Sequence, residues 1–516
     1  MIKFKDYEQS QLQLLPPNLV DLIDPEDPVL VVNRVIDKLG PEILYKPFTS
    51  ATGQPPYHPL MMIKLIIFSY TQGIFSCRKM EKAAWYDIRF MWLCAMQTPD
   101  YKTINRFRSK YFAEVLKDIF AEVVLLMLEE GYIKGEDYFV DGTKIAANAN
   151  KHSHVWKKNV HRYKQAALDR AAEIVKEADR INESECCSEE TESNSASASK
   201  KAKEIEDGIN DDDDYKTKRK KKSLGAKLRK ESEKIKKYED QEECLNGRNS
   251  YSKTDNEATF LRMKNEELLP AYNLQVGTEN GFICGISIHQ NANDGAVFID
   301  HMRKRELMRL APPKRVIADA GYGHIKNYDY LDDNKIEAYL KYPSFSIEES
   351  RLKQYRFHNS KFMMNKDGEI FCPAGNKMNR IDAEVLHIRQ SSFVCDQCHD
   401  CEFLSECAKG KTERTLYTSK RLRRRQKKAR DLLDSSMGYL LRKRRGNEVE
   451  SVFGDMKHNL KLRQFSLRGL EKVTLESILY ALAFNIRKMA TTNPLYPLFA
   501  QLFLRKRGKY RSIFAL

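Results

Sequence analysis

The sequence predicts a mixed α/β protein in which a helical N-terminal domain precedes a second domain built on strands. Three observations lead to this prediction. Apolar residues recur at helical spacing through the first 130 residues, two apolar runs each end in an aspartate at a glycine-bearing turn, and a late amphipathic helix carries a glutamate. A chain of 516 residues is too long for one hydrophobic core and indicates two to four domains.

The overall charge indicates a polyanionic partner. Lys+Arg number 88 against 72 for Asp+Glu, which gives a net charge of +16 and a pI near 9.1. Ribosomes, membranes and DNA all satisfy that balance. No apolar run approaches the ~20 residues of a membrane span, and the N-terminus lacks a signal-peptide core. We therefore expect a cytoplasmic protein with no membrane partner and reduced cysteines.

The N-terminal domain is predicted to consist of an arm followed by helices. Several prolines predict that residues 1 to about 50 form an extended arm with one short helix. Helices are then expected at 60–70, after Ser76, at 88–92, at 101–108 behind the cap Asp100, and at 112–128. In the 101–108 helix, the side chains predicted to face outward, as on a recognition helix, are Lys102, Asn105, Arg106 and Arg108. A solvated basic face on a helical bundle is the alternative.

Two strands are predicted to end in carboxylates. Tyr138-Phe139-Val140 runs into Asp141-Gly142, and Val316-Ile317-Ala318 runs into Asp319 and a Gly-Tyr-Gly turn. Taken singly, a strand-terminal aspartate is more often a turn residue than a metal ligand. The pairing of two such strands with a third carboxylate is what favours a metal site.

The third carboxylate is expected on the helix at 448–460. Its buried face is formed by Val449, Val452, Phe453, Met456 and Leu460. Glu450 and Lys457 lie two turns apart and project together from the flank of that face. Three fixed carboxylates beside a lysine suit two divalent cations and a phosphodiester. Glu448, on the opposite flank, is the rival third carboxylate.

The segments 138–150, 318–323 and 448–460, with the helical N-terminal region and a cysteine cluster, resemble the DDE transposases of bacterial insertion sequences, specifically the insertion sequence 1182 family, related to the insertion sequence 4/5 superfamily. The resemblance implies a ribonuclease H-like fold in which Asp141, Asp319 and Glu450 bind two Mg²⁺ or Mn²⁺ ions. Lys457 matches the Glu-x₆-Lys segment of related transposases. Tyr439 and Arg442 lie too far upstream for that family's tyrosine and arginine, and Arg444 or Arg445 is nearer.

The resemblance also implies partners and a location. The expected activity is DNA cleavage at transposon ends followed by strand transfer through the DDE triad. The partners are double-stranded DNA, as terminal inverted repeats and target, and a second copy of the chain in a homodimer on DNA. We expect the protein in the bacterial cytoplasm at the nucleoid. A domesticated transposase that only binds DNA and a hydrolytic nuclease of the same fold are the competing functions.

Two insertions are predicted in the strand-bearing domain. The first, 151–260, is expected to be a hairpin of two helices joined by a polar loop at 183–200 that contains Cys186-Cys187. Its basic run Lys216 to Lys222 adjoins the acidic run Asp211 to Asp214. Either the two runs balance each other, or the basic run is an arm that holds phosphates near the transposon end. Strands at 272–276 and 282–289, joined by the turn signal Thr278-Glu279-Asn280-Gly281, a strand at 336–340 and a helix capped by Asp294 complete the domain.

The second insertion, 344–429, holds clustered cysteines and a basic segment. For a structural Zn²⁺ we expect Cys372, Cys395, Cys398 and Cys407, with Cys401 as the alternative ligand. An iron–sulfur cluster and metal-free thiols are weaker alternatives. The basic segment is expected to neutralise DNA phosphates through Arg421, Arg423, Arg424, Arg425, Lys427 and Lys428.

These expectations divide the chain as follows: 1–130, arm and helical DNA-binding domain; 131–343 plus 430–490, catalytic domain; 151–260, helical-hairpin insertion; 344–429, cysteine-rich insertion and basic segment; 491–516, basic tail.

Overall fold

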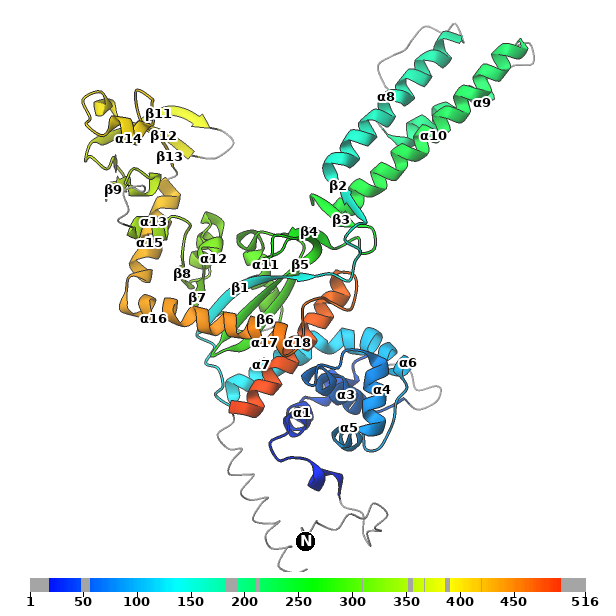
Figure 1. Cartoon of the computed structure of the whole chain (residues 1–516), viewed down its shortest axis with the longest axis vertical. Helices are drawn as coiled ribbons and strands as arrows, with labels where there is room; N and C mark the ends of the chain where they lie inside the picture. Colours follow the sequence, from blue (N-terminus) through cyan, green and yellow to red (C-terminus); the bar gives the residue numbers. More distant parts are fainter. Residues whose placement is uncertain are drawn as a thin grey trace, which may run out of the picture.

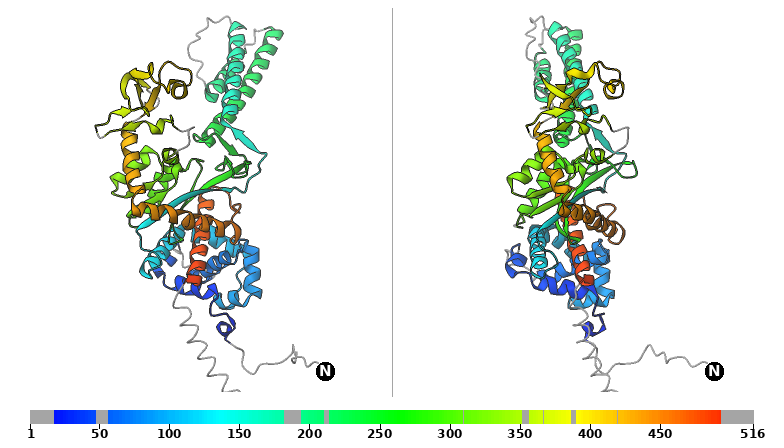
Figure 2. Two further views of the ribbon diagram at one scale, coloured as in Figure 1. Left: turned by 60° about the vertical axis from the view of Figure 1, so that its left-hand side comes forward. Right: turned by 90° about the vertical axis from the view of Figure 1, so that its left-hand side faces the viewer.

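The computed structural model describes residues 18–47, 56–181, 194–209, 214–308, 310–350, 356–365, 367–385, 390–418 and 420–492. Mixed helices and sheets confirm the α/β class. A base of N-terminal helices supports a central sheet, and both insertions project from the end opposite that base (Figures 1 and 2).

The base contains η1 (Leu19–Leu22), α1 (Pro28–Asp37), α2 (Pro41–Tyr45), α3 (Pro59–Thr71), α4 (Cys77–Tyr86), α5 (Ile88–Leu93), α6 (Tyr101–Arg106), the π-helical turn η2 (Phe107–Phe112) and α7 (Ala113–Glu129). The expectation of an extended arm was wrong for residues 18–47. Pro28 occupies the first turn of α1, where proline is tolerated, and Asp27 caps it by accepting from the Val29 N–H. Val32 and Val35 of α1 are fully buried in the main core. Residues 1–17 of the predicted arm lie outside the described residues.

The central sheet comprises β1 (Asp137–Ala146), β4 (Thr259–Arg262), β5 (Leu268–Glu279), β6 (Phe282–His289), β7 (Arg315–Ala318) and β8 (Glu337–Leu340). Its order is β4-β5-β1-β7-β8, with β6 also paired to β5. β1, β5 and β6 are antiparallel neighbours, whereas β1, β7 and β8 run parallel. The predicted β5–β6 hairpin turns at Asn280 and Gly281, whose φ angles of 51° and 70° suit an Asn-Gly pair.

Helices cover both faces of this sheet. Neighbouring residues of β1 point to opposite faces. Tyr138 bonds His301 of α11 (Asp294–Glu306), whereas Phe139 packs with Ile317, Leu441 and Val449. That second face is covered by α16 (Ser436–Arg445), the π-helical turn η7 (Gly446–Glu450) and α17 (Ser451–His458). The buried helix α18 (Leu470–Thr492) packs against β6 and the N-terminal helices. The helix α12 (Ile325–Asp333) was not predicted.

The first insertion contains three described helices rather than the predicted two. β2 (His154–Trp156) pairs with β3 (Ser250–Ser252) at its root, followed outward by α8 (Lys157–Ile181) and α10 (Tyr215–Leu245). α9 (Ser195–Asp207) occupies part of the predicted loop because Asn194 caps it and Ala198, Ala202 and Ile205 pack into the hairpin core. Cys186-Cys187 and Asp211 to Asp213 lie outside the described residues.

The second insertion forms a separate small lobe with its own core. Its sheet order is β13-β12-β11-β10-β9. The elements are α13 (Phe345–Glu349), η5 (Asn359–Lys361), β9 (Met363–Met364), β10 (Ile370–Phe371), β11 (Lys377–Val385), β12 (Gln390–Val394), η6 (Asp396–Cys398), α14 (Leu404–Ala408) and β13 (Thr415–Thr418), after which α15 (Lys420–Leu433) leads to α16. Among the described helices, none combines the length and apolarity needed to cross a membrane. Most of the predicted basic tail, from residue 493 onward, lies outside the described residues.

Candidate active site

Strand register brings the two predicted aspartates together. β1 and β7 pair in parallel with Phe139 opposite Ile317. Continuing that register by two residues puts Asp141 beside Asp319 on the same face of the sheet, because side chains alternate with a period of two. Asp319 begins the short helical turn η3 (Ala320–Tyr322) and accepts a 2.8 Å hydrogen bond from the Gly321 N–H. Two strands distant in sequence therefore present neighbouring carboxylates.

The surroundings of Asp141 disfavour the charged form of its carboxyl group. Burial raises its pKa to about 6, and the nearby carboxylates of Asp319 and Asp294 add to the rise. The Gly142 N–H, which donates at 2.8 Å, and Arg445, whose Nη1 lies 3.5 Å from Asp141 Oδ2, act against it. A half-buried carboxylate whose negative charge is under-compensated is suited to a cation.

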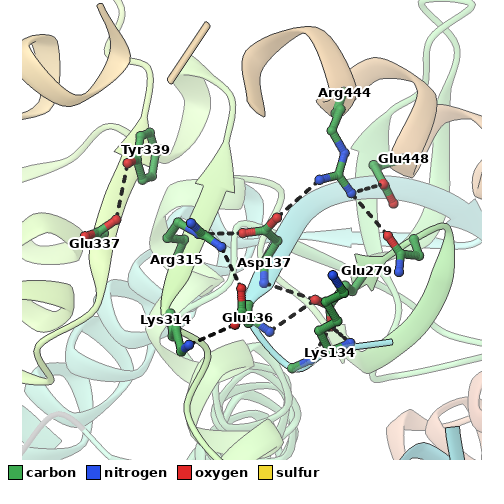
Figure 3. Close-up of polar contacts among 12 residues, drawn as sticks. Lys134, Glu136, Asp137, Glu279, Lys314, Arg315, Glu337, Tyr339, Arg444 and Glu448 are labelled. Carbon is green, nitrogen blue, oxygen red and sulfur yellow. Dashed lines mark hydrogen bonds and ion pairs between the residues drawn. The ribbon is translucent and has the colours of Figure 1, made fainter. Parts of the chain in front are cut away.

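The helix of the third carboxylate gives its two glutamates different surroundings. Glu448 is buried and occupied: its Oε2 accepts from the Gly281 N–H at 2.5 Å and its Oε1 from Arg444 at 2.9 Å. Figure 3 shows Arg444 between Glu448 and Asp137 at the start of β1. Glu450 is exposed and has no hydrogen-bond or ion-pair partner among the described residues. The rival Glu448 thus holds the β5–β6 turn, and Glu450 remains available.

Contacts on both sides of Glu450 hold the helix against β1. Upstream, Arg445 contacts Asp141; downstream, Lys457 Nζ donates at 2.5 Å to Thr143 Oγ1. Asp141 and Thr143 lie on the same strand face, and Glu450, Gly454 and Lys457 lie on the same helix face. A Cβ added at Gly454 would meet nothing within 4 Å, so this face of the helix borders open space. Burial lowers the pKa of Lys457, and the nearby Lys264 lowers it further.

A hydrogen-bonded network behind Asp141 was not predicted as part of the site. Asp294 Oδ1 accepts from Asn273 at 2.8 Å and from Gln275 at 2.7 Å. The hydroxyl of buried Tyr322 donates to Gln275 Oε1 at 2.6 Å. The expectation that Asp294 caps α11 was wrong, because Asn293 provides that cap. The signal available was two polar residues, Asn273 and Gln275, at alternate positions of an otherwise apolar strand.

Glycine at position 142 is required by this network. A Cβ there would lie 2.2 Å from Gln275 Nε2 and 2.5 Å from Asp294 Oδ1. The Asp-Gly pair therefore serves packing as well as turn formation. Tyr322 of the Gly-Tyr-Gly turn is buried in the network, whereas His324, which follows that turn, is exposed and rests against Gly295.

The described residues contain no group of three or more His, Cys, Asp or Glu side chains arranged to hold a metal ion. The cysteines nevertheless converge: Cys372, Cys395, Cys398, Cys401 and Cys407 all line one small pocket. Burial and the neighbouring thiols of Cys398 and Cys372 raise the pKa of Cys395 to about 12. Thiols crowded in this way are a donor set that suits Zn²⁺, which deprotonates the thiols it binds.

The predicted recognition helix has three outward side chains and one inward. Lys102, Asn105 and Arg106 are exposed and border a groove that reaches Ser466 and Leu467. The outward placement expected for Arg108 was wrong. Its side chain is buried and donates to the Phe75 carbonyl at 3.2 Å and to Asn105 Oδ1 at 3.3 Å. The π-helical turn that begins at Phe107 rotates it off the helical period.

Most of the basic side chains expected to bind DNA in this segment form contacts within the protein instead. Arg423 donates to the backbone carbonyls of Asn359 and Phe362 and so joins α15 to the cysteine-rich lobe. Arg421, Arg425 and Lys428 pair with Asp329 or Asp332 of α12. Arg424 and Lys427 are exposed and have no acidic partner among the described residues. Of the six basic residues expected to bind DNA, these two are the ones that the described contacts leave without an acidic partner.

Two family models match the chain. The first, described as "Transposase DDE domain", covers residues 371–490 and so includes the five clustered cysteines and the Glu450 helix. The second, described as "Transposase domain (DUF772)", covers residues 17–110, which include the helices of the base from η1 to α6. The chain is a DDE transposase. No curated protein and no solved structure matches it.

The transposase acts on DNA with a nuclease class of activity, and DDE domains generally use divalent metal ions such as Mg²⁺. Asp141 and Asp319 lie outside both matched segments, so their assignment depends on the geometry above. Neither match distinguishes the insertion sequence 1182 family from other DDE transposases.

Proposed function

We propose that the transposase cleaves transposon ends and joins them to target DNA at a site formed by Asp141, Asp319 and Glu450. The observation that carries this proposal is the pairing of Asp141 with Asp319 on the sheet face that the Glu450 helix covers. The strand order β6-β5-β1-β7-β8, antiparallel on one side of β1 and parallel on the other, supports a ribonuclease H-like fold. We assign the protein to the insertion sequence 1182 family on the segments quoted above.

Asp141, Asp319 and Glu450 would hold two divalent cations, Mg²⁺ or Mn²⁺. Their hard oxygen donors and the raised pKa of Asp141 fit such ions. Ions held by these residues would supply activation of the attacking oxygen and stabilisation of the leaving oxygen in an in-line displacement. The unpartnered Glu450 side chain would complete the set by turning toward Asp141, since Arg445 and Lys457 hold the helix against β1 on either side of it.

Lys457 binds a phosphate beside the scissile bond. Its Nζ already points to β1 two residues beyond Asp141, and its single hydrogen bond to Thr143 leaves two ammonium protons for an anion. The same site first exposes a 3′-hydroxyl at the transposon end and then positions that hydroxyl against a target phosphodiester. Both steps need the same residues, so a single substitution abolishes both.

The remaining contacts follow from exposed basic residues. Lys102, Asn105 and Arg106 of α6 contact terminal-repeat DNA, and Arg424 and Lys427 of α15 contact phosphates. Arg108, Arg421, Arg423, Arg425 and Lys428 are committed within the protein and are not carried into this proposal. Two ends must be paired for transposition, so we expect a homodimer on DNA in the cytoplasm at the nucleoid. Cys372, Cys395, Cys398 and Cys407 hold a structural Zn²⁺.

The decisive experiment is end cleavage and strand transfer with Mg²⁺ by Asp141→Asn, Asp319→Asn and Glu450→Gln. Each variant should lose both reactions by about 10³-fold or more while it still binds DNA, because the electrostatic stabilisation of the transition state is lost. Glu448→Gln is the matched control on the same helix. Full activity of Glu450→Gln, with loss in Glu448→Gln at unchanged stability, would exchange the two glutamates. Cleavage without joining by the unaltered protein would identify a hydrolytic nuclease instead.

A further inference from the structure

The longest helix of the first insertion, α10, sorts its charges along its length. Its first half, residues 215–230, holds nine basic residues and no acidic one: Lys216, Lys218, Arg219, Lys220, Lys221, Lys222, Lys227, Arg229 and Lys230. The second half, 231–245, holds all six acids of the helix and three lysines, Lys234, Lys236 and Lys237. A helix that is only exposed to solvent does not require its basic and acidic residues to be separated in this way.

The basic half lies at the free end of the hairpin. α10 ends at Leu245, beside β3, which pairs with β2 at the root. Glu242 bonds Lys164 near the start of α8, at the root, whereas Lys221 Nζ donates at 3.2 Å to the carbonyl of Gly208, just beyond the end of α9. At 1.5 Å per residue, Lys222 lies about 35 Å from Leu245 along the helix. Figures 1 and 2 show this hairpin projecting beyond the rest of the molecule.

The basic side chains point outward from the hairpin. Leu224, Gly225 and Leu228 form the buried stripe that packs against α9. The side chains of Lys216, Arg219, Lys220, Lys222, Lys227, Arg229 and Lys230 are exposed and have no acidic partner in the described part of the chain. In the described part of the arm, Glu231 pairs with Arg170 and Lys234, and Glu242 pairs with Lys164, all in the second half of α10.

The neighbouring helix does not offset this charge. α9 contributes Lys200, Lys201 and Lys203 against Glu204, Glu206 and Asp207, and so is neutral overall. A rigid helix with surplus positive charge over about 20 Å matches the phosphate spacing of a DNA duplex over roughly six base pairs. The root packs against the central sheet, because the rings of His154 and Trp156 in β2 contact the ring of Phe260 in β4. The arm is therefore held at a constant distance from the carboxylates.

We propose that the free end of α10 binds the backbone of duplex DNA ten or more base pairs from the scissile phosphate. This inference rests on the proposed function, because it takes the DNA held at Asp141 and Asp319 as its reference point. The distance follows from the length of the arm, since about 35 Å is one turn of B-DNA. Contacts of this kind add affinity without reading sequence. They lengthen the stretch of transposon end that the protein holds during cleavage.

The test compares two triple variants of the full-length protein in EDTA, where no cleavage occurs. Arg219→Ala/Lys220→Ala/Lys222→Ala removes three exposed charges from the free end, and Lys234→Ala/Lys236→Ala/Lys237→Ala removes the same charge from exposed positions of the second half. Binding of a fluorescent 40-base-pair duplex of mixed sequence is measured from 50 to 200 mM KCl. Far-UV circular dichroism confirms that both variants keep their helices.

The first variant should bind about tenfold more weakly at 100 mM KCl, and the slope of log affinity against log salt should fall by about 1 to 3, since each lost phosphate contact removes about 0.9. The control slope should change by less than about 0.5. Equal slopes would overturn the proposal and indicate that the acidic run at 211–214 neutralises the basic half. A loss seen with single-stranded RNA but not with duplex DNA would also overturn it. Because binding in EDTA does not use the carboxylates, inactive triad variants would leave this result unaffected.

Discussion

Lys457 donates a hydrogen bond from its Nζ to Thr143 Oγ1, and this 2.5 Å contact fastens the Glu450 helix to the strand that carries Asp141. The bond joins residues 314 positions apart. Its lysine lies on the same helix face as Glu450, and its threonine lies on the same strand face as Asp141. The contact therefore keeps the helix face that carries Glu450 next to the strand face that carries Asp141.

Lys457→Ala should lower the rate of end cleavage by about 10- to 100-fold, because a charge-assisted contact to a phosphate is lost from the site. Thr143→Val removes the partner and keeps the ammonium, so it should retain most of the activity. Single-turnover cleavage with Mg²⁺ measures both variants. Equal losses would indicate that Lys457 only holds the helix in place.

Substitution of Glu448 should mainly lower stability, whereas substitution of Glu450 should mainly lower catalysis. Glu448→Gln leaves the Gly281 N–H and Arg444 with a neutral partner and should cost about 1 to 3 kcal/mol of unfolding free energy. Glu450→Gln should abolish cleavage with little change in stability, because Glu450 is exposed. Thermal melts and the cleavage assay together test this. A stability loss in Glu450→Gln larger than that in Glu448→Gln would contradict the assignment.

Asp141→Asn should be at least as stable as the unaltered protein although it is inactive. Burial raises the pKa of Asp141 to about 6, so its charged form opposes folding at pH 7 and its neutral amide replacement does not. The expected gain is about 1 to 3 kcal/mol before any new strain. Denaturant unfolding at pH 7 provides the comparison, and a clear loss of stability would show that the carboxylate is structurally required.

Gly142→Ala should disrupt the network behind Asp141. Its Cβ would lie within 2.5 Å of both Gln275 and Asp294, so these side chains must shift, at a cost of about 1 to 3 kcal/mol and with a fall in cleavage rate. Gly454→Ala is the matched control: its Cβ meets open space in a helix, and it should stabilise the protein by about 0.5 to 1 kcal/mol. Melting temperatures that move in the same direction would contradict this account.

Two buried histidines should make the catalytic domain sensitive to acid. Burial and the nearby Lys304 lower the pKa of His289 from 6.5 to about 4, and burial also holds the pKa of His301 well below its usual range. The unfolded chain therefore binds more protons below pH 6.5, and stability should be full above that pH and fall progressively toward pH 4. The raised pKa of Asp141 makes its contribution to stability change with pH in the opposite direction, so the thermal melts are best made on the Asp141→Asn variant. In that background His301→Gln should flatten the profile, whereas the exposed His324→Gln should not.

The metal of the cysteine-rich lobe can be tested by substitution. We expect about one Zn²⁺ per chain, lost in Cys398→Ser and retained in Cys401→Ser, because Cys398 is buried in the lobe core and Cys401 is the expected spare. Metal content and the absorption spectrum after Co²⁺ substitution measure this. Loss in Cys401→Ser with retention in Cys407→Ser would exchange those two ligands. Metal-free protein from cells grown with zinc would remove the site.

Local patterns in the sequence were sufficient for most elements near the site. The apolar runs before Asp141 and Asp319 are strands, the Asn280-Gly281 signal is a hairpin turn, and four of the five apolar residues at 449–460 are fully buried on one helix face. These features depend on side-chain period and turn chemistry, which neighbouring residues determine. The same reasoning missed α1 as a buried helix and α9 as a third helix of the arm, because tertiary packing stabilises both.

The sequence by itself determined that two strands end in aspartates and that one amphipathic helix carries glutamates, since periodicity and turn residues are local properties. Only the tertiary structure decided which carboxylates meet. The parallel register of β1 and β7 places Asp141 next to Asp319. The β5–β6 turn donates a hydrogen bond to Glu448, so that Glu450 keeps its side chain unpartnered in the described part of the protein. A π-helical turn directs Arg108 inward. Such outcomes depend on contacts between residues hundreds of positions apart, whose energies no short stretch of sequence contains.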